Sequence, residues 1–547
     1  MILGGGLAGL TLALQLKQRL PDLPVLVLER KAHPVPLAAH KVGESSVEIG
    51  AHYFSKVLGL EPHLKTEQLK KFGFRFFFSE GRRDIDQVTE LGASRYMSVP
   101  SYQIDRGSFE NFLGEEAQRR GIRFVDEAVV RKVQLADQAG DDALHEVTWE
   151  HAGTTHVTPA RWVVDASGRA GLIKRQLDLA EPNAHEAHAV WFRIQGRIDI
   201  DQWSNDPAWR ARCDPPHRWQ STNHLVGAGY WAWLIPLSSG SHSVGIVADP
   251  RLHPLDTMNT FDKAMTWFER YQPRLFDELD PRRDSLQDFA FFRRFSYGCK
   301  QVFSSQRWAL TGEAGLFLDP FYSPGSDFIA MSNTYITDLV CRDLLGQRWG
   351  AQAQVYDQLL HSFYESTLAL YVDQYPIFAD AEVLPVKVIW DYAYYWGVLS
   401  QMFFQERLTD LGVMSRLRAE LSHCQALNIA AQGFLRRWSQ VSAKRNPAVM
   451  LDQAKLPWFA DINRSLNDAH LDDDGFVARI QQSTLQLRAL LRQIVAQAQQ
   501  DHPLLDASEV LTALALNPMP LQSNPWDAVA MLDLGQPSRQ PACAALG

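Results

Sequence analysis

Apolar residues in the first part of the chain follow the spacing of short buried strands around a helix. Residues 1–3 are apolar and lead into a glycine-rich turn, a run with helical spacing covers residues 10–20, and residues 25–28 form a second apolar run. Strand, helix and strand in this order predict a parallel sheet of the α/β class. Three segments further along alternate as strands do: 123–125, 129–133 and 145–149.

Two later apolar strands end in turns of small residues, at 161–169 and at 308–314. We expect them to join the same sheet, with insertions near 40–110 and near 185–300 interrupting the chain between its strands. The second insertion contains three strand-like segments: 189–194, 229–235 and 241–247. It therefore predicts a sheet that covers the bound ligand.

Beyond about residue 326 the apolar positions recur every three or four residues, which is the helical period. The predicted fold is α/β: a Rossmann-like nucleotide-binding domain with an inserted β-sheet substrate domain and a C-terminal helical region. The nucleotide-binding domain is predicted over 1–325 and is discontinuous, over about 1–40, 105–180 and 300–335. The inserted antiparallel sheet is predicted at about 185–300, and the helical cap and tail at 330–547. The tail, 517–547, has several prolines and little charge, which favours either a surface-wrapping or a disordered segment.

Gly4, Gly6 and Gly9 form a G-x-G-x-x-G turn between the first strand and the helix, and Glu29 ends the second strand about 20 residues later. Gly4 allows the tight turn, Gly6 lets the backbone approach a pyrophosphate, and Gly9 lets the helix pack on the sheet. Glu29 is expected to accept hydrogen bonds from the adenosine ribose. The sequence has no second complete fingerprint, so we expect no internal nicotinamide site.

The net charge and the cysteines restrict the expected binding partners and cellular compartment. The net charge of −9 and the absence of a long basic run make nucleic acid an unexpected partner. Five scattered cysteines without a C-x-x-C pair fit a reduced compartment and argue against structural zinc. No uncharged stretch has the length of a membrane span. We therefore expect a cytoplasmic protein.

Trp231 and Trp233 are two positions apart on a predicted strand and so share one face of it. Aromatic residues at this spacing usually pack in a core, with Pro236 ending the strand. Two neighbouring indoles can also form the wall of a ligand site. The spacing alone leaves both interpretations open.

Lys71 lies among phenylalanines at positions 72, 74, 76, 77 and 78. An amine in such surroundings is partly desolvated, which lowers its pKa and leaves it able to donate a proton or to act as a nucleophile. Lys70 is adjacent and is an alternative. The other interpretation is a solvated lysine at the edge of an aromatic core.

Four segments together resemble the flavin-dependent halogenases, within the larger class of FAD monooxygenases. They are the glycine turn with Glu29; residues 41–45, K-V-G-E-S; residues 231–236, which match W-x-W-x-I-P at every fixed position; and residues 319–325, D-P-F-Y-S-P-G. The segments occur in the family's order between residue 4 and about residue 335.

The resemblance implies reduced FAD supplied by a flavin reductase, a halide ion as co-substrate and a small electron-rich aromatic substrate. It implies that the two indoles separate the flavin from the substrate, so that only a small oxidant passes, and that Lys71, in a K-x-G-x-x-F segment like that of phenol- and pyrrole-directed enzymes, is the active-site lysine. The implied cofactor-binding residues are Gly4, Gly6, Gly9, Glu29, Lys41, Gly43, Glu44, Ser45, Arg106, Gly312, Glu313, Asp319 and Pro320.

The halide segment departs from the family pattern. Proline at position 324 has no N–H to donate, so the expected donors are the amides of Gly325 and Ser326, one residue further along. Tyr322 stands where tryptophan-specific enzymes have a glutamate. A phenol, pyrrole or indole-type substrate other than free tryptophan is therefore expected, either free or tethered to a carrier protein. The alternative is a monooxygenase or dehydrogenase of the same fold that does not halogenate.

Overall fold

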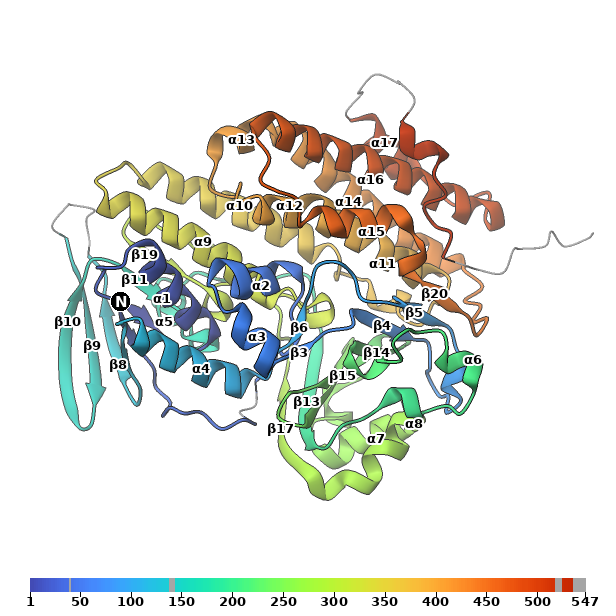
Figure 1. The fold of residues 1–547 in the computed structure, drawn as a ribbon, viewed down its shortest axis with the longest axis horizontal. Coiled ribbons are helices and arrows are strands. Elements are labelled where there is room, and N and C mark those ends of the chain that lie inside the picture. Colours follow the sequence, from blue (N-terminus) through green and yellow to red (C-terminus); the bar gives the residue numbers. More distant parts are fainter. Residues whose placement is uncertain (39–40, 137–142, 517–523, 535–547) are drawn as a thin grey trace, which may run out of the picture.

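The protein is described by a computed structural model for residues 1–38, 41–136, 143–516 and 524–534 (Figure 1). A five-stranded parallel sheet forms the nucleotide-binding domain and confirms the expected Rossmann-like architecture. Its order is β19 (Trp308–Leu310), β11 (Val163–Asp165), β1 (Ile2–Leu3), β2 (Leu26–Leu28) and β7 (Arg123–Val125).

Helix α1 (Leu7–Arg19) follows the glycine turn and packs between α4 (Arg106–Arg119) and α9 (Gly325–Leu344). Leu10, Leu12 and Leu14 of α1 are fully buried. The continuous apolar run of this helix is explained by its position, because an α1 enclosed by the sheet and two helices has almost no solvent face.

A separate three-stranded antiparallel sheet lies at the left edge of Figure 1. It consists of β8 (Val129–Gln134), β9 (His145–His151) and β10 (Thr154–Ala160). The segments 129–133 and 145–149 are strands, as the sequence predicts, but they belong to this sheet and not to the parallel one. Buried and more exposed residues alternate along β9, as expected for an antiparallel ribbon with one face in water, whereas β11 inside the central sheet is buried on both faces.

The second insertion folds into a sheet larger than its predicted range. The order is β17 (Leu286–Phe292), β13 (His188–Gln195), β16 (Ser241–Ala248), β15 (Tyr230–Pro236), β14 (Thr222–Gly227), β4 (Phe74–Phe77), β5 (Glu90–Gly92) and β20 (Met450–Asp452). Two strands come from the first insertion and one from the helical region. The pairs β4–β14 and β5–β20 are parallel, so the sheet is mixed rather than wholly antiparallel.

The two faces of this sheet belong to different cores. Ala232 and Leu234 of β15 pack with α7 (Phe261–Tyr271) and α8 (Pro273–Leu279) on one side. Trp231 and Trp233 point to the other side, into the core shared with the nucleotide-binding domain. The alternation of the strand thus directs both indoles toward the domain that carries the glycine turn.

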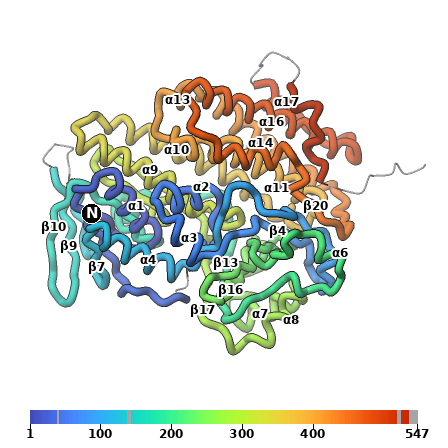
Figure 2. The backbone as a smooth tube through the Cα atoms, in the orientation of Figure 1, coloured from blue at the N-terminus to red at the C-terminus, as the bar shows by residue number. Residues whose placement is uncertain are grey.

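Helices cover the top of the molecule in Figures 1 and 2. The main ones are α10 (Gly350–Leu368), α11 (Val383–Tyr394), α14 (Arg418–Val441) and α16 (Asp473–Asp501). Of the proline-containing tail, only residues 524–534 are among those described, and the rest of that prediction falls outside them. In the described part of the chain, no helix combines the length and apolar character needed to cross a membrane.

Candidate active site

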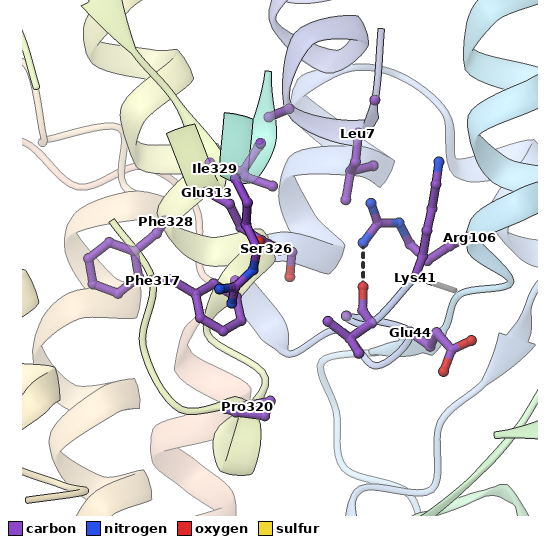
Figure 3. Close-up of a pocket in the computed structure, with 18 of the residues that line it drawn as sticks. Leu7, Lys41, Glu44, Arg106, Glu313, Phe317, Pro320, Ser326, Phe328 and Ile329 are labelled. Carbon is purple, nitrogen blue, oxygen red and sulfur yellow. Dashed lines mark hydrogen bonds and ion pairs between the residues drawn. The ribbon is translucent and has the colours of Figure 1, made fainter. Parts of the chain in front are cut away.

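A cavity of about 480 Å³ lies where the glycine turn, the segment 41–45, the indole pair and the start of α9 meet. Figure 3 shows Arg106 and Lys41 on one side of it and Glu313 and Ser326 on the other. The cavity brings together most of the residues singled out in the sequence: Gly4, Gly6, Glu29, Lys41, Gly43, Glu44, Ser45, Arg106, Trp231, Trp233, Gly312, Glu313, Asp319, Pro320, Gly325 and Ser326. Gly9 and Lys71 lie behind its wall.

The three glycines of the turn are required for different reasons. A Cβ on Gly4, whose φ is +116°, would lie 2.3 Å from the Ala166 carbonyl oxygen, and one on Gly9 would lie 2.0 Å from the Gly4 oxygen. A Cβ on Gly6 would meet no atom within 4 Å, because this residue faces the cavity. The first amides of α1 point toward the same space, as helix starts do. The arrangement fits a pyrophosphate approaching Gly6.

Glu29 is held rigidly at the end of β2. Its Oε2 accepts from the Gly5 amide and its Oε1 from the Lys31 amide, each at 2.7 Å. Two backbone bonds fix the carboxylate at the cavity edge, where it retains lone pairs for hydroxyl donors. This geometry fits the expected ribose contact.

The cationic side of the cavity is built around Glu110. Arg106 donates to this carboxylate at 2.6 and 3.1 Å and to the Val42 carbonyl at 2.7 Å, and Lys41 forms an ion pair with it. Burial lowers the pKa of Arg106 to about 10 and that of Lys41 to about 7. Glu44 is engaged elsewhere, since Arg193 of β13 donates to it at 2.6 and 2.9 Å and thereby anchors the segment 41–45 to the large sheet.

Glu313 and Asp319 differ in how their carboxylates are used. Glu313, after Gly312, lines the cavity and pairs with Arg169 at 2.9 Å. Asp319 is fully buried, and its Oδ2 lies 2.7 Å from His185 Nε2 and accepts from the Tyr375 hydroxyl. Asp319 therefore braces the cavity wall from inside the protein, while its neighbour Pro320 faces the cavity.

Trp231 and Trp233 line the cavity and are also buried, so the pair is at once part of the core and part of the wall of the site. Their ring centroids are 5.6 Å apart at 41°. Trp231 donates to the Tyr375 hydroxyl at 3.2 Å and Trp233 to Ser243 Oγ at 3.1 Å. These bonds fix the orientation of each ring, which gives the cavity a rigid aromatic wall.

Lys71 lies one hydrogen bond behind that cavity. Its Nζ donates to Ser45 Oγ at 2.8 Å and to the Ser46 carbonyl at 3.0 Å, and it sits 3.4 Å from the centroid of Phe74. The side chain is buried, and this burial lowers the pKa of Lys71 to about 7. Lys70 is exposed and lies over Tyr96, so of the two lysines only Lys71 is directed inward.

The start of α9 provides two adjacent amide donors. Asp327 and Phe328 donate their amides to the Pro324 carbonyl at 3.1 and 3.0 Å. The amides of Gly325 and Ser326 have no acceptor among the described residues, and both residues line the cavity. Successive amides at the positive end of a long helix form an anion site, so proline at position 324 leaves two usable donors.

Sequence reasoning missed two buried carboxylates near Lys71. Asp327 accepts from the Gly50 amide at 2.8 Å and from the Tyr395 hydroxyl at 2.6 Å, and burial raises its pKa to about 8. Glu48, the first residue of α2 (Glu48–His52), is also buried, and burial raises its pKa. For Glu48 the available signal was an acid three residues after Ser45. For Asp327 the sequence offered no such signal, because the neighbours of this residue come from distant segments.

A Rossmann-like sheet with a glycine turn, a fixed acid and a ligand-sized cavity defines a dinucleotide-binding protein. The model of the family described as tryptophan halogenase matches residues 83–375, and that of the NAD(P)-binding Rossmann-like domain matches residues 2–66. The chain belongs to the tryptophan halogenase family. It is a flavin-dependent halogenase that uses FAD and a halide, and the comparisons favour this activity over a monooxygenase or dehydrogenase that does not halogenate.

Several relatives and solved structures are similar to the chain. It is 25% identical to the flavin-dependent halogenase chlA of Dictyostelium discoideum, over 73% of this chain and 69% of that one. It is 23% identical to the 1H-pyrrole-2-carbonyl-[peptidyl-carrier protein] brominase of Pseudoalteromonas luteoviolacea, over 65% and 80%. The crystal structure of halogenase PltM in complex with phloroglucinol and FAD superposes with a TM-score of 0.62 at 16% identity, covering 91% of this chain and 96% of that chain.

Proposed function

We propose that the protein halogenates a phenol or pyrrole ring and that Lys71 is the catalytic residue. The observation that carries the proposal is the placement of the Lys71 amine. It is enclosed, bonded to Ser45, and separated by that one residue from the cavity. Burial lowers the pKa of Lys71 to about 7, so a large fraction remains an ammonium near neutral pH.

Reduced FAD, when bound, supplies with oxygen and halide the small oxidant, hypohalous acid. The residues proposed to hold FAD are those of the glycine turn, Glu29 and Arg106, and the amides of Gly325 and Ser326 are proposed to hold the halide. The indole pair excludes the organic substrate from the cavity. Lys71 then receives the oxidant on the other side of Ser45.

The ammonium of Lys71 donates a hydrogen bond to the oxygen of hypohalous acid. The carbon–halogen bond forms as the oxygen–halogen bond breaks, and the electron pair of the broken bond stays on oxygen. That oxygen takes a proton and leaves as water, while the ring loses one proton. The exchange is ArH + HOX → ArX + H₂O, and Lys71 makes the oxygen a better leaving group.

The contacts of Tyr322 favour a substrate whose aromatic ring is activated by its own oxygen or nitrogen. Its hydroxyl donates to Asp391 at 2.7 Å, and Lys387 donates to the same carboxylate oxygen at 2.7 Å. The position is thus committed to a buried ion pair and offers no free carboxylate to a substrate. A phenol or pyrrole needs less help in losing its proton because its own oxygen or nitrogen stabilises the charge.

The relatives support the same substrate class. Two act on 1H-pyrrole-2-carbonyl groups attached to a peptidyl-carrier protein, and one halogenates tetracycline. The structural neighbour PltM was solved with phloroglucinol, a phenol. We propose a ring of this kind, free or tethered to a carrier.

We also propose a separate flavin reductase and a cytoplasmic setting. The reductase is supported by the single dinucleotide fingerprint. The setting is supported by the cysteines, because those in the described ranges all have free thiols: Cys213, Cys299, Cys341 and Cys424.

The test is the mass of the product formed by purified protein with reduced FAD, oxygen and bromide, offered a panel of phenols, pyrroles and indoles. We expect a bromine isotope pair that falls about 100-fold or more with Lys71→Ala, because general acid catalysis contributes that much. Lys70→Ala is the matched control and should keep the activity, and both variants should bind FAD. Gain of one oxygen, or loss of two hydrogens, would contradict the proposal.

A crystal soaked in bromide tests the halide site. Density against the amides of Gly325 and Ser326 is expected. Density elsewhere in the cavity would rule out this pair of donors.

A further inference from the structure

The segment that binds the Lys71 amine also carries a buried carboxylate, Glu48, two residues after the Ser46 carbonyl that accepts from the amine. Ser45 and Ser46 accept the two hydrogen bonds of the amine, and Glu48 follows at the start of α2. The Glu48 residue is 6% exposed, and its Oε2 has no hydrogen-bond partner among the described residues. Burial raises the pKa of Glu48, while the neighbouring Trp396 indole and the Lys71 amine both lower it. A buried carboxylate in this state is costly unless a nearby cation compensates it. Burial lowers the pKa of Lys71, and the charges of Glu48 and Asp327 raise it, Glu48 more than Asp327.

The other ionisable groups around Lys71 either already form hydrogen bonds or carry no charge near neutral pH. Asp327 uses both oxygens, one for the Gly50 amide and one for the Tyr395 hydroxyl. His224 of β14 packs edge-on against Phe74, the ring over which the Lys71 amine lies, and burial lowers the pKa of this histidine to about 3, so it carries no charge near neutral pH. Tyr392 and Tyr395 face Glu48, and burial raises the pKa of both far above the neutral range.

We infer that Glu48 is a positioning residue that acts through Lys71, holding the amine as an ammonium in a place where burial favours the neutral form. When the oxygen–halogen bond breaks, Lys71 gives its proton to the departing oxygen, which becomes water. The proton that the ring loses returns to the amine. Glu48 stabilises the ammonium formed in this way. The inference rests on the proposed role of Lys71 and deepens it.

Position 322, where tryptophan-specific enzymes have a glutamate, is tyrosine in this chain, so a carboxylate that serves Lys71 comes from another position. That tyrosine is bonded to Asp391 within the helical region. Glu48 approaches from α2, whose close packing against α9 is set by Gly50. The acid beside the lysine is therefore supplied by a different element.

The test is the pH profile of bromination in Glu48→Gln and Glu48→Met, each carried out with reduced FAD, oxygen and bromide. Without the negative charge the Lys71 ammonium is lost at lower pH. The alkaline limb of kcat should therefore move down by about one pH unit, with FAD binding unchanged. Glu48→Asp keeps a shorter carboxylate and should lie between wild type and Glu48→Gln.

Glu116→Gln is the matched control, because Glu116 is a buried acid on α4 that pairs with Arg119 and Arg120. Its alkaline limb should match wild type, and a shift there would overturn the inference. An unchanged limb in the Gln and Met variants would also overturn it. If neither variant folds, Glu48→Asp decides, and a wild-type profile in it counts against the inference. Product retained by Lys71→Ala would instead remove the proposed function itself.

Discussion

At the scale of single residues, the glycine turn separates positions that fold the chain from a position that faces the cavity and that we propose receives the ligand. Gly4 and Gly9 have backbone atoms within 2.3 Å of where a side chain would begin. Gly6 has none within 4 Å. The same residue type therefore serves two purposes within one turn, and substitution separates them.

Gly4→Ala should lower the free energy of unfolding by several kcal/mol, because a positive φ and a backbone clash act together. Gly6→Ala should change it by less than about 1 kcal/mol, since the new methyl group enters open space. It should nevertheless weaken FAD binding, because the methyl group occupies the approach of the pyrophosphate. Denaturant unfolding and flavin fluorescence titration measure the two effects. Equal destabilisation by both substitutions would contradict this account.

At the scale of elements, the start of α9, which we propose holds the halide, is positioned by its contact with α2. A Cβ on Gly50 of α2 would lie 2.2 Å from Ser326 Oγ and 2.7 Å from Ser326 Cβ. The two helices approach this closely only because position 50 has no side chain. The amides that would hold the halide thus depend on a residue distant in sequence.

Gly50→Ala should displace Ser326 and raise the KM for bromide about tenfold or more, with little change in FAD affinity, because the clash falls on the amide nest rather than on the glycine turn. Steady-state kinetics against bromide concentration would measure this. Gly114→Ala is the control, since its Cβ would make an ordinary 3.4 Å contact with Phe124. A Gly50→Ala enzyme with the wild-type bromide KM would show that the contact does not position the site.

At the scale of the whole molecule, a buried ion cluster joins the segments that extend the large sheet. Glu90 of β5 pairs with Arg75 of β4 and with Arg218, which precedes β14, and all three side chains have no exposed surface. Burial alone would raise the pKa of Glu90, but Arg75 and Arg218 outweigh it and the pKa is lowered. The cluster stabilises the fold only while Glu90 is ionised.

Glu90→Gln should lower the free energy of unfolding by about 3–5 kcal/mol at pH 7, because buried Arg75 loses its ion-pair partner and buried Arg218 is left with Asp201, at 3.2 Å. The folded-state pKa of Glu90 lies below its unfolded value, so the wild-type advantage is present above about pH 4.3 and is lost as the pH falls through the folded pKa. Urea unfolding across this range measures the difference. A difference that stayed constant into strong acid would show that ionisation of Glu90 is not its source.

The sequence by itself determined the features that are local along the chain. The glycine turn with Glu29, the shared face of Trp231 and Trp233, and the helical period after about residue 326 each depend on neighbours a few positions apart. Pro324 predicted a shifted pair of amide donors for the same reason, since a missing N–H is a property of the residue.

Only the tertiary structure decided which distant segments meet. It separated β8 and β9 from the parallel sheet, placed β20 beside β5, turned Lys71 inward rather than Lys70, and brought Glu48 and Asp327 to the amine. These contacts join residues far apart in sequence, and their geometry follows from the packing of whole elements rather than from any local pattern. A buried carboxylate and a solvated one are the same residue type in a sequence, and only the surroundings that the fold supplies distinguish them.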